Sequence, residues 1–291
     1  MNQAQSHPYV FGQAEKEIYR LEHQSHLWDP LTLQVLQAAG ITEGMRVLDL
    51  GCGPGDVSLM LAQLVGANGS VCGVDQNASF LQHAQTRAQQ AGLVQISFLT
   101  GRLPEDLPQL FAHQQFDAVV GRAILHFVPD LRKLLQAIRE ILRPGGLLIF
   151  HEPDALLTEL ITNHQGGSPL LHRCRTWLRE AFEQAGHNVQ VNLTLASTLQ
   201  EAGFPPPHMQ VTGVAGTSAD RHIAEWITLL IASLFSQIVQ GGIASEKEIE
   251  LETLTQRIQE EMSLQGGYQV AHLLLGVWTN KEIGQELVER Q

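Results

Sequence analysis

The sequence predicts an α/β protein whose core is a doubly wound, mostly parallel sheet. Over residues 45–152, short segments that are apolar throughout alternate with segments of helical spacing. Strands that are apolar throughout are typical of a parallel sheet that is covered on both faces. Right-handed crossovers between such strands place the connecting helices on both sides of the sheet, which gives the doubly wound arrangement.

The elements of this alternation follow from apolar periodicity and from the positions of glycine and proline. We expect strands at 45–50, 70–75, 95–99, 116–121 and 147–152, and helices at 56–65, 78–91 and 130–142. The segment Arg143-Pro144-Gly145-Gly146 is expected to form the turn before the fifth strand.

The segments on either side of this core are expected to be mostly helical. Residues 1–12 look loosely structured, and residues 14–39 have helical spacing. Asp29-Pro30 is expected to divide that helix, because a proline favours the first turn of a helix and ends the preceding one. After the fifth strand we expect helices at about 154–163, 169–186, 195–202, 219–239 and 245–263, and strands at 209–213 and 269–278.

Composition limits the class of protein and its partners. The chain has 291 residues, of which 44% are hydrophobic and 16% charged, as in ordinary globular proteins. The net charge of −12 disfavours a nucleic-acid substrate. No apolar stretch approaches the roughly 18 residues of a spanning helix, and the first residues lack the pattern of a secretory signal. With three cysteines in no paired spacing, we expect a cytoplasmic protein with no membrane association.

One segment carries the chemical signal of the sequence. Residues 47–55 read V-L-D-L-G-C-G-P-G, which is a strand followed by three alternate glycines and a helix. Glycine is required where the backbone turns tightly and lets a ligand approach. A dinucleotide-binding loop would carry its third glycine at the position of Asp56. The negative charges of Asp49 and Asp56 would repel a diphosphate, whereas they would not repel a sulfonium cation.

This segment resembles motif I of the class I S-adenosylmethionine-dependent methyltransferases, and the resemblance extends over about residues 41–153. It implies a Rossmann-like sheet of seven mostly parallel strands with a helical lid and cap. It also implies that Asp75, at the end of the second strand, holds the ribose hydroxyls. Many members of the family have Asp at the position of Arg102, where the adenine is contacted. The resemblance implies the following cofactor-binding residues: Asp49, Gly51, Cys52, Gly53, Gly55, Asp75, Gln76, Arg102, Leu103, Arg122, Tyr19 and Arg20.

The same resemblance suggests a division of the chain by role. Residues 1–40 would form an N-terminal helical lid, and residues 41–153 the S-adenosylmethionine-binding core. Residues 154–291 would complete the sheet and carry an inserted helical substrate cap at about 218–264. An apolar stripe in this insert, including Trp226, Leu230 and Leu234, suggests a hydrophobic or aromatic small-molecule acceptor. The exposed helices could also pair in a homodimer.

Three residues at strand ends are candidates for catalysis. In a doubly wound sheet, ligands bind outside the carboxyl ends of the strands. His126 could act as a general base because an imidazole titrates near neutral pH, and His151 and Glu152 end the fifth strand. Alternatively, His126 is a structural histidine on the turn before Pro129, and Glu152 caps the helix after Pro153.

Several other functions stay open. A nucleic-acid methyltransferase is disfavoured by the sequence after the fourth strand and by the net charge, and a protein methyltransferase stays an alternative. A non-catalytic protein that binds S-adenosylmethionine and regulates another process is not distinguished from an enzyme. We expect no metal: His23 with His26, and His222 with Glu225, have helical spacing, but the sequence shows no third ligand.

Overall fold

The computed structural model of the chain describes residues 14–165 and 168–282. They fold into two compact units. Among the described residues, the first unit, here called the sheet unit, comprises 29–152, 191–211 and 275–282. The second, here called the helical unit, comprises the described residues within 14–28, 153–190 and 212–274. No helix among the described residues has both the length and the apolar character needed to cross a membrane.

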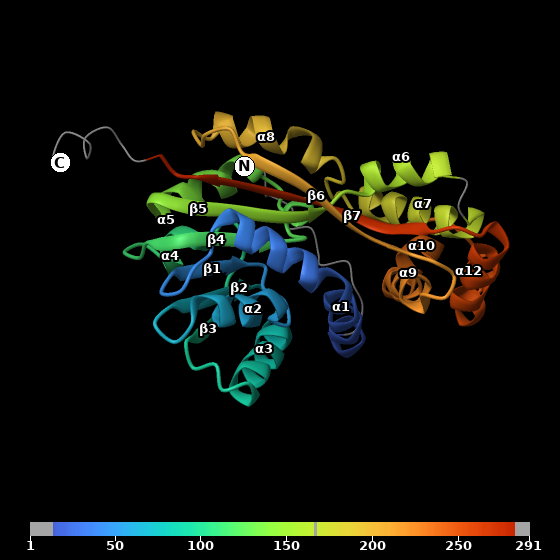
Figure 1. The fold of residues 1–291 in the computed structure, drawn as a ribbon, viewed down its shortest axis with the longest axis horizontal. Coiled ribbons are helices and arrows are strands. Elements are labelled where there is room, and N and C mark those ends of the chain that lie inside the picture. Colours follow the sequence, from blue (N-terminus) through green and yellow to red (C-terminus); the bar gives the residue numbers. More distant parts are fainter. Residues whose placement is uncertain (1–13, 166–167, 283–291) are drawn as a thin grey trace. The chain divides into compact units, whose positions relative to one another are not determined.

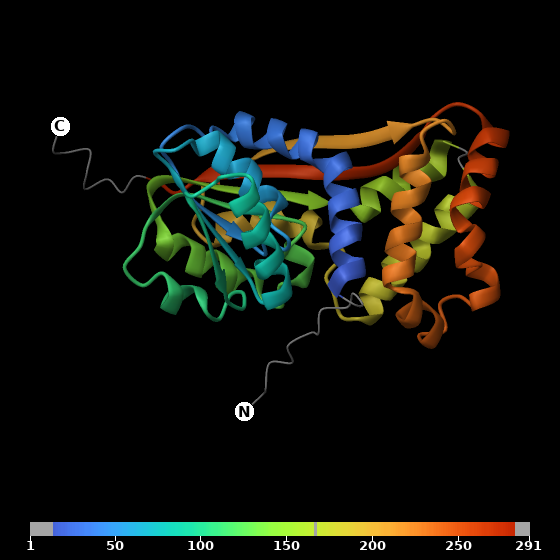
Figure 2. The same cartoon turned by 90° about the horizontal axis from the view of Figure 1, so that it is seen from below.

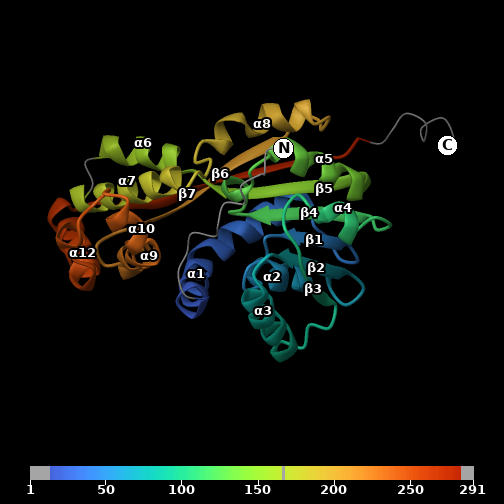
Figure 3. The same cartoon turned by 180° about the vertical axis from the view of Figure 1, so that it is seen from behind.

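The sheet has seven strands in the order β3-β2-β1-β4-β5-β7-β6 (Figure 1). Strands β1 to β5 pair in parallel, as expected from their apolar sequences. The strands are β1 Arg46–Leu50, β2 Ser70–Asp75, β3 Ile96–Thr100, β4 Phe116–Arg122, β5 Leu142–Pro153, β6 His208–Gly216 and β7 Gln269–Asn280. Figure 3 shows the same order from behind.

Helices cover both faces of the sheet unit, and two apolar cores result. Alternate residues of β1 point to opposite cores: Val47 packs with α1 Ala14–Ala39, α2 Asp56–Val65 and α3 Ala78–Gln90, while Leu48 packs with α5 Leu131–Ile141 and α8 Val191–Glu201. The doubly wound arrangement expected from the sequence is therefore confirmed. Two short elements that the periodicity did not predict are α4 Leu107–Leu110 and the 3₁₀ turn η1 Leu125–Phe127.

Two expectations about local structure are wrong. Helix α1 continues through Pro30, so Asp29-Pro30 does not divide it. Gly145 and Gly146 belong to β5 and do not form a free turn, because the Gly145 amide donates to the Lys281 carbonyl and the Lys281 amide donates to the Gly146 carbonyl, each at 2.8 Å. Sequence periodicity did not reveal this pairing, since its partner lies more than 130 residues away.

The helical unit contains the predicted helices, two of them interrupted. Its helices are α6 Ala155–Gln165, α7 Pro169–Gln184, α9 Arg221–Ser233, α10 Phe235–Gln240, α11 Glu246–Ile249 and α12 Leu251–Gln265, with the first part of α1. Helices α9 and α12 pack side by side (Figure 2). Helix α11 ends where Glu250 adopts a left-handed conformation with φ 44°. Described residues of the expected lid (1–40) and of the expected cap (about 218–264) belong to this unit. That these segments cover the cofactor and the substrate stays a prediction. The expected loose segment 1–12 lies outside the described residues.

Candidate functional site

The site forms where the parallel strands of the sheet unit end. The strand register places Leu50 of β1 beside Val74 of β2, and Arg122 of β4 beside His151 of β5. Because these strands are parallel, their carboxyl ends lie along one edge of the sheet, where ligands bind in doubly wound folds. The pairing therefore brings together the candidate residues that follow β1, β2, β4 and β5 in the sequence.

The glycine-rich loop between β1 and α2 combines packing with open space. Gly51 and Gly53 have φ angles of 63° and 53°, which disfavour residues with a side chain. A Cβ at Gly51 would lie 2.4 Å from Ile124 Cδ1, whereas nothing lies within 4 Å of a Cβ at Gly53. A Cβ at Gly55 would lie 2.9 Å from the Ala84 Cβ on α3. Gly51 and Gly55 are thus required by packing, and Gly53 leaves space above the loop.

Asp75 holds this loop from the end of β2. Its Oδ2 accepts a hydrogen bond from the Gly53 amide at 3.0 Å, and its Oδ1 accepts one from the Asn77 amide at 2.8 Å. Burial raises the pKa of the Asp75 carboxyl, and these amides oppose the rise. A carboxylate has about four acceptor positions, so Asp75 retains acceptor capacity for a ligand.

Asp49 lies beneath the loop and is 1% exposed. Its Oδ2 accepts a hydrogen bond of 2.6 Å from the Ser58 hydroxyl on α2. Burial raises the pKa of Asp49 to about 7, against the lowering effects of Ser58 and Arg122. The carboxyl is therefore divided between its charged and neutral forms near neutral pH, and a nearby cation would favour the charged form.

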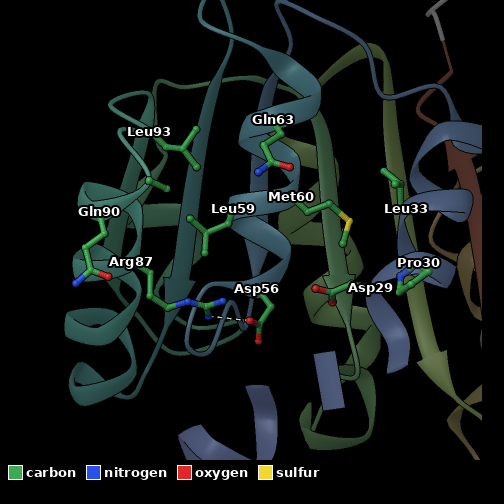
Figure 4. A pocket seen from close by; sticks show the side chains of 11 residues that line it. Asp29, Pro30, Leu33, Asp56, Leu59, Met60, Gln63, Arg87, Gln90 and Leu93 are labelled. Carbon is green, nitrogen blue, oxygen red and sulfur yellow. Dashed lines mark hydrogen bonds and ion pairs between the residues drawn. The ribbon is translucent and has the colours of Figure 1, made fainter. Parts of the chain in front are cut away.

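Asp56 carries a counter-ion that the sequence did not reveal. Arg87 of α3 contacts its Oδ1 at 2.7 Å, as Figure 4 shows. The electrostatic argument against a diphosphate is weaker here than the sequence suggested, because this charge is already compensated.

The groove in Figure 4 lies along α1, α2 and α3, and neither Asp75 nor the glycine-rich loop lines it. It is therefore a different feature from the site at the strand ends.

A buried polar network follows β4 and β5. Arg122 donates to Asp29 Oδ1 at 2.6 Å and to the Thr32 hydroxyl at 3.3 Å, both on α1. Thr32 also forms a hydrogen bond of 3.1 Å with His151 Nδ1. Through Asp29 and Thr32, the second part of α1 thus fixes two of the residues that the sequence placed at the strand ends.

His151 and Cys52 stay uncharged in this environment. Burial, with a contribution from Arg122, lowers the pKa of His151 to about 3. Burial also raises the pKa of the Cys52 thiol well above its ordinary value. At neutral pH, His151 is therefore a neutral imidazole, and so low a pKa makes it a weak general base. The catalytic role of His151 is inferred from its position at a strand end and stays a prediction. The low pKa disfavours that role.

Glu152 is fully buried, and its contacts shape the turn after β4. Its two oxygens accept hydrogen bonds from the amides of Ile124 at 3.0 Å and Leu125 at 3.2 Å. His126 Nδ1 lies 3.7 Å from Glu152 Oε2. Glu152 therefore positions the segment that carries His126, and the two catalytic candidates are neighbours.

The same turn contains a conformation that costs free energy. Ala123 has a φ of 52°, and its amide donates to the His151 carbonyl at 3.1 Å. A non-glycine residue in this region costs of order 1–3 kcal/mol, and such positions concentrate at functional sites. Ala123 is a site residue that sequence reasoning missed, because alanine has no side-chain chemistry to indicate it.

The residues expected at the adenine differ in their exposure. The Arg102 side chain is 64% exposed and lies 3.6 Å from Asp106, which also accepts the Arg102 amide at 2.8 Å. Leu103 is half-buried against the sheet core. Gln76 is exposed just after Asp75. Leu103 therefore offers an apolar surface close to the end of β3.

Tyr19 and Arg20 belong to the helical unit. Arg20 is 3% exposed and donates to both oxygens of Glu17, at 2.6 and 2.9 Å, and to Gln24 Oε1 at 2.9 Å. Tyr19 is 61% exposed. Arg20 already has a carboxylate partner, so its expected role toward the methionine carboxylate stays a prediction.

Asp29 and Thr32 are two further residues that sequence reasoning missed. Both lie about 90 residues or more from Arg122 in the sequence, and no short-range pattern links them to it. Asp29 was instead interpreted as part of a helix boundary. Only the packing of α1 against the sheet brings these side chains to the strand ends.

Residues 41–203, more than half of the chain, match the family model of a methyltransferase domain. The chain is 39% identical over 122 residues to an arsenite methyltransferase from Aquipseudomonas alcaligenes, covering 40% of this chain and 35% of that protein. It is 37% identical over 135 residues to a 2-phytyl-1,4-naphtoquinone methyltransferase from Trichormus variabilis, covering 45% and 56%. The chain thus spans between about a third and just over half of the length of these relatives.

A solved structure shares the fold at low sequence identity. It is phosphoethanolamine N-methyltransferase 2 from Haemonchus contortus, in complex with phosphomonomethylethanolamine and S-adenosylhomocysteine. The TM-score is 0.55 and the identity 17%, over 87% of this chain and 52% of that chain.

We predict that Glu152→Gln destabilises the protein by about 1–3 kcal/mol, because one of the two buried oxygens that accept backbone amides becomes an NH2 group, which leaves an amide without its acceptor. Urea denaturation measures the change. Glu140→Gln makes the same chemical change at an exposed position of α5 and should have little effect. Equal stability of the two variants would contradict the positioning role of Glu152.

We further predict a pH effect of His151. Its folded-state pKa of about 3 lies below the ordinary 6.5, so the unfolded state binds more protons between these values. This group therefore lowers stability as the pH falls below 6.5, by about 2 kcal/mol at pH 5. In urea denaturation, the stability of wild type relative to His151→Gln should rise by that amount from pH 5 to pH 7. A difference that does not vary with pH would show that His151 is not held neutral.

Proposed function

Because this chain belongs to the class I S-adenosylmethionine-dependent methyltransferases, we propose that it transfers the methyl group of S-adenosylmethionine to a small-molecule acceptor. The observation that carries the proposal is the loop of residues 51–55, which is held by Asp75 and leaves space above Gly53. This arrangement lies at the carboxyl edge of a parallel sheet, where this class of fold binds its ligands.

The residues present fit this cofactor. Asp75 retains acceptor capacity for the ribose hydroxyls, and Gly53 lets the backbone approach the ligand. Leu103 offers an apolar surface for the adenine. The Asp49 carboxyl, poised near neutral pH, favours a cationic ligand over an anionic one. Gly51, Gly55, Cys52, Gln76, Arg102 and Arg122 complete the proposed cofactor-binding set of the sheet unit. Tyr19 and Arg20, which the family resemblance also implies, belong to the helical unit.

The bound cofactor would supply an already activated methyl group on a sulfonium. The protein then has to align the acceptor and exclude water, and alignment of this kind can be worth about 7–11 kcal/mol. Glu152 and the strained Ala123 hold the turn that presents His126, which is 14% exposed. We propose His126 as the residue that accepts a proton when the acceptor arrives protonated, with Glu152 positioning it.

The acceptor class rests on the relatives and not on the helical insert. Trp226, Leu230 and Leu234 are buried in the helical unit, so this stripe forms core and does not by itself indicate a hydrophobic pocket. The relatives named above are methyltransferases of arsenite and of a naphthoquinone. We propose a small metabolite, hydrophobic or aromatic as in the second case, methylated at oxygen, nitrogen or carbon.

Isothermal titration with S-adenosylhomocysteine tests the cofactor assignment, with NAD as a control ligand. Asp75→Asn should weaken binding about 10- to 100-fold, because hydrogen bonds to charged groups are worth about 1.5–3 kcal/mol. Asp130→Asn is the matched control: Asp130 also accepts a backbone amide, from Lys133 at 3.0 Å, but caps α5. Unchanged affinity in Asp75→Asn, or binding of NAD instead, would overturn the assignment.

A second prediction separates ligand contact from backbone strain. Gly53→Ala and Gly44→Ala both place a side chain at a positive φ with no atom within 4 Å, so each should lose about 1–2 kcal/mol of stability. Only Gly53→Ala should also weaken S-adenosylhomocysteine binding, because its Cβ enters the space above the loop. Equal affinity of the two variants would place the ligand elsewhere.

Turnover distinguishes an enzyme from a non-catalytic binding protein. Formation of S-adenosylhomocysteine should be measured with a panel of quinols, phenols, amines and arsenite as acceptors. Product formation that depends on one of these acceptors supports the proposed function. Cofactor binding without turnover on the whole panel would favour a regulatory role.

A further inference from the structure

Three side chains with metal-binding chemistry meet in the helical unit, away from any residue used above. His23 comes from α1, and His222 and Glu225 come from the first turns of α9. One potential ligand atom of each lies within 4.8 Å of the others. The sequence showed His23 with His26, and His222 with Glu225, as two separate pairs at helical spacing, and the fold brings His23 to the second pair from about 200 residues away.

The separation of His222 and Glu225 is near that of two ligands of one transition metal ion. Zinc–nitrogen and zinc–oxygen bonds of about 2.0–2.2 Å place tetrahedral ligand atoms about 3.3–3.5 Å apart. His222 Nδ1 and Glu225 Oε2 are 3.9 Å apart, which is within about 0.6 Å of that separation. The His222 side chain is 69% exposed and that of Glu225 is 32% exposed, so both can make this adjustment without disturbing the core.

His23 has a ring nitrogen available for a ligand. Its Nε2 is buried and has no hydrogen-bond partner in the structure. A buried polar atom without a partner costs free energy, and a metal ion is one way to satisfy it.

Glu225 is also oriented by a neighbour. Its Oε1 accepts a hydrogen bond of 3.0 Å from Arg221 Nε, which leaves Oε2 directed toward His222. Carboxylate ligands are commonly held by a hydrogen bond of this kind.

We propose that His23, His222 and Glu225 bind a divalent transition metal ion of the zinc class. Two imidazoles and one carboxylate suit such an ion, whereas magnesium and calcium prefer oxygen ligands alone. The three residues leave one tetrahedral position for water. The ion links α1 to α9 within the helical unit.

Titration of zinc chloride into the metal-stripped full-length chain tests the site. The wild type should bind one zinc ion per chain, and His222→Gln and Glu225→Gln should weaken this binding at least 10-fold. Both are surface substitutions that leave folding intact. His113→Gln is the matched control, because His113 is an exposed histidine of the sheet unit, and its zinc binding should equal that of wild type.

Thermal unfolding gives an independent measurement. A ligand that binds only the folded state raises the midpoint of unfolding as its concentration rises. Zinc should therefore raise the midpoint of the wild type and of His113→Gln, but not that of His222→Gln. Zinc binding and a midpoint shift that persist in His222→Gln would overturn the proposal, as would the absence of zinc binding by the wild type.

Discussion

The hydrogen bond from the Gly53 amide to the Asp75 carboxylate joins the first two strands of the sheet at the edge where the site forms. It holds the loop in a conformation that glycine adopts without strain and that leaves space above it. Gly51 must lack a side chain for a different reason, since Ile124 occupies that space. The turn after β4 therefore packs against the loop after β1, and Glu152 holds that turn in place. Loop, turn and strand ends depend on one another through these contacts.

Buried charges at this edge are each compensated in a different way. Asp56 is paired with Arg87, and Asp29 with Arg122. Asp75 is surrounded by backbone amides, whereas Asp49 has only one hydroxyl donor and an elevated pKa. Asp49 is thus the carboxyl whose charge responds most to what binds near it. A cationic ligand stabilises its ionised form, and an anionic ligand would oppose it.

The helical unit has a separate group of buried polar side chains, which hydrogen-bond to one another on α1 and α9. Glu17, Arg20 and Gln24 form a buried hydrogen-bonded group on α1, and Ser233 of α9 donates to Glu17 at 3.1 Å. Within the same stretch of α1, His23 lies near His222 and Glu225 of the same α9. Polar contacts therefore connect these two helices in addition to apolar packing, in which Trp28 and Trp226 lie 6.0 Å apart between ring centroids. These contacts explain why α1 carries so many buried polar residues for a helix of this unit.

The alternation of apolar and helical segments was sufficient to determine the α/β class, the parallel core and nearly all elements, because burial on both faces imposes this pattern locally. The spacing of Gly51, Gly53 and Gly55 after Asp49, with Asp75 one strand later, was likewise sufficient to indicate the family, since these backbone requirements lie within about 30 residues. The tertiary structure alone decided the pairing of Gly145 and Gly146 with Lys281, the partners Asp29 and Thr32 of the site, and the meeting of His23 with α9. Each of these contacts joins side chains or strands that are far apart in the sequence. Periodicity and short motifs report only a residue's immediate neighbours, whereas these partners are determined by how whole elements pack.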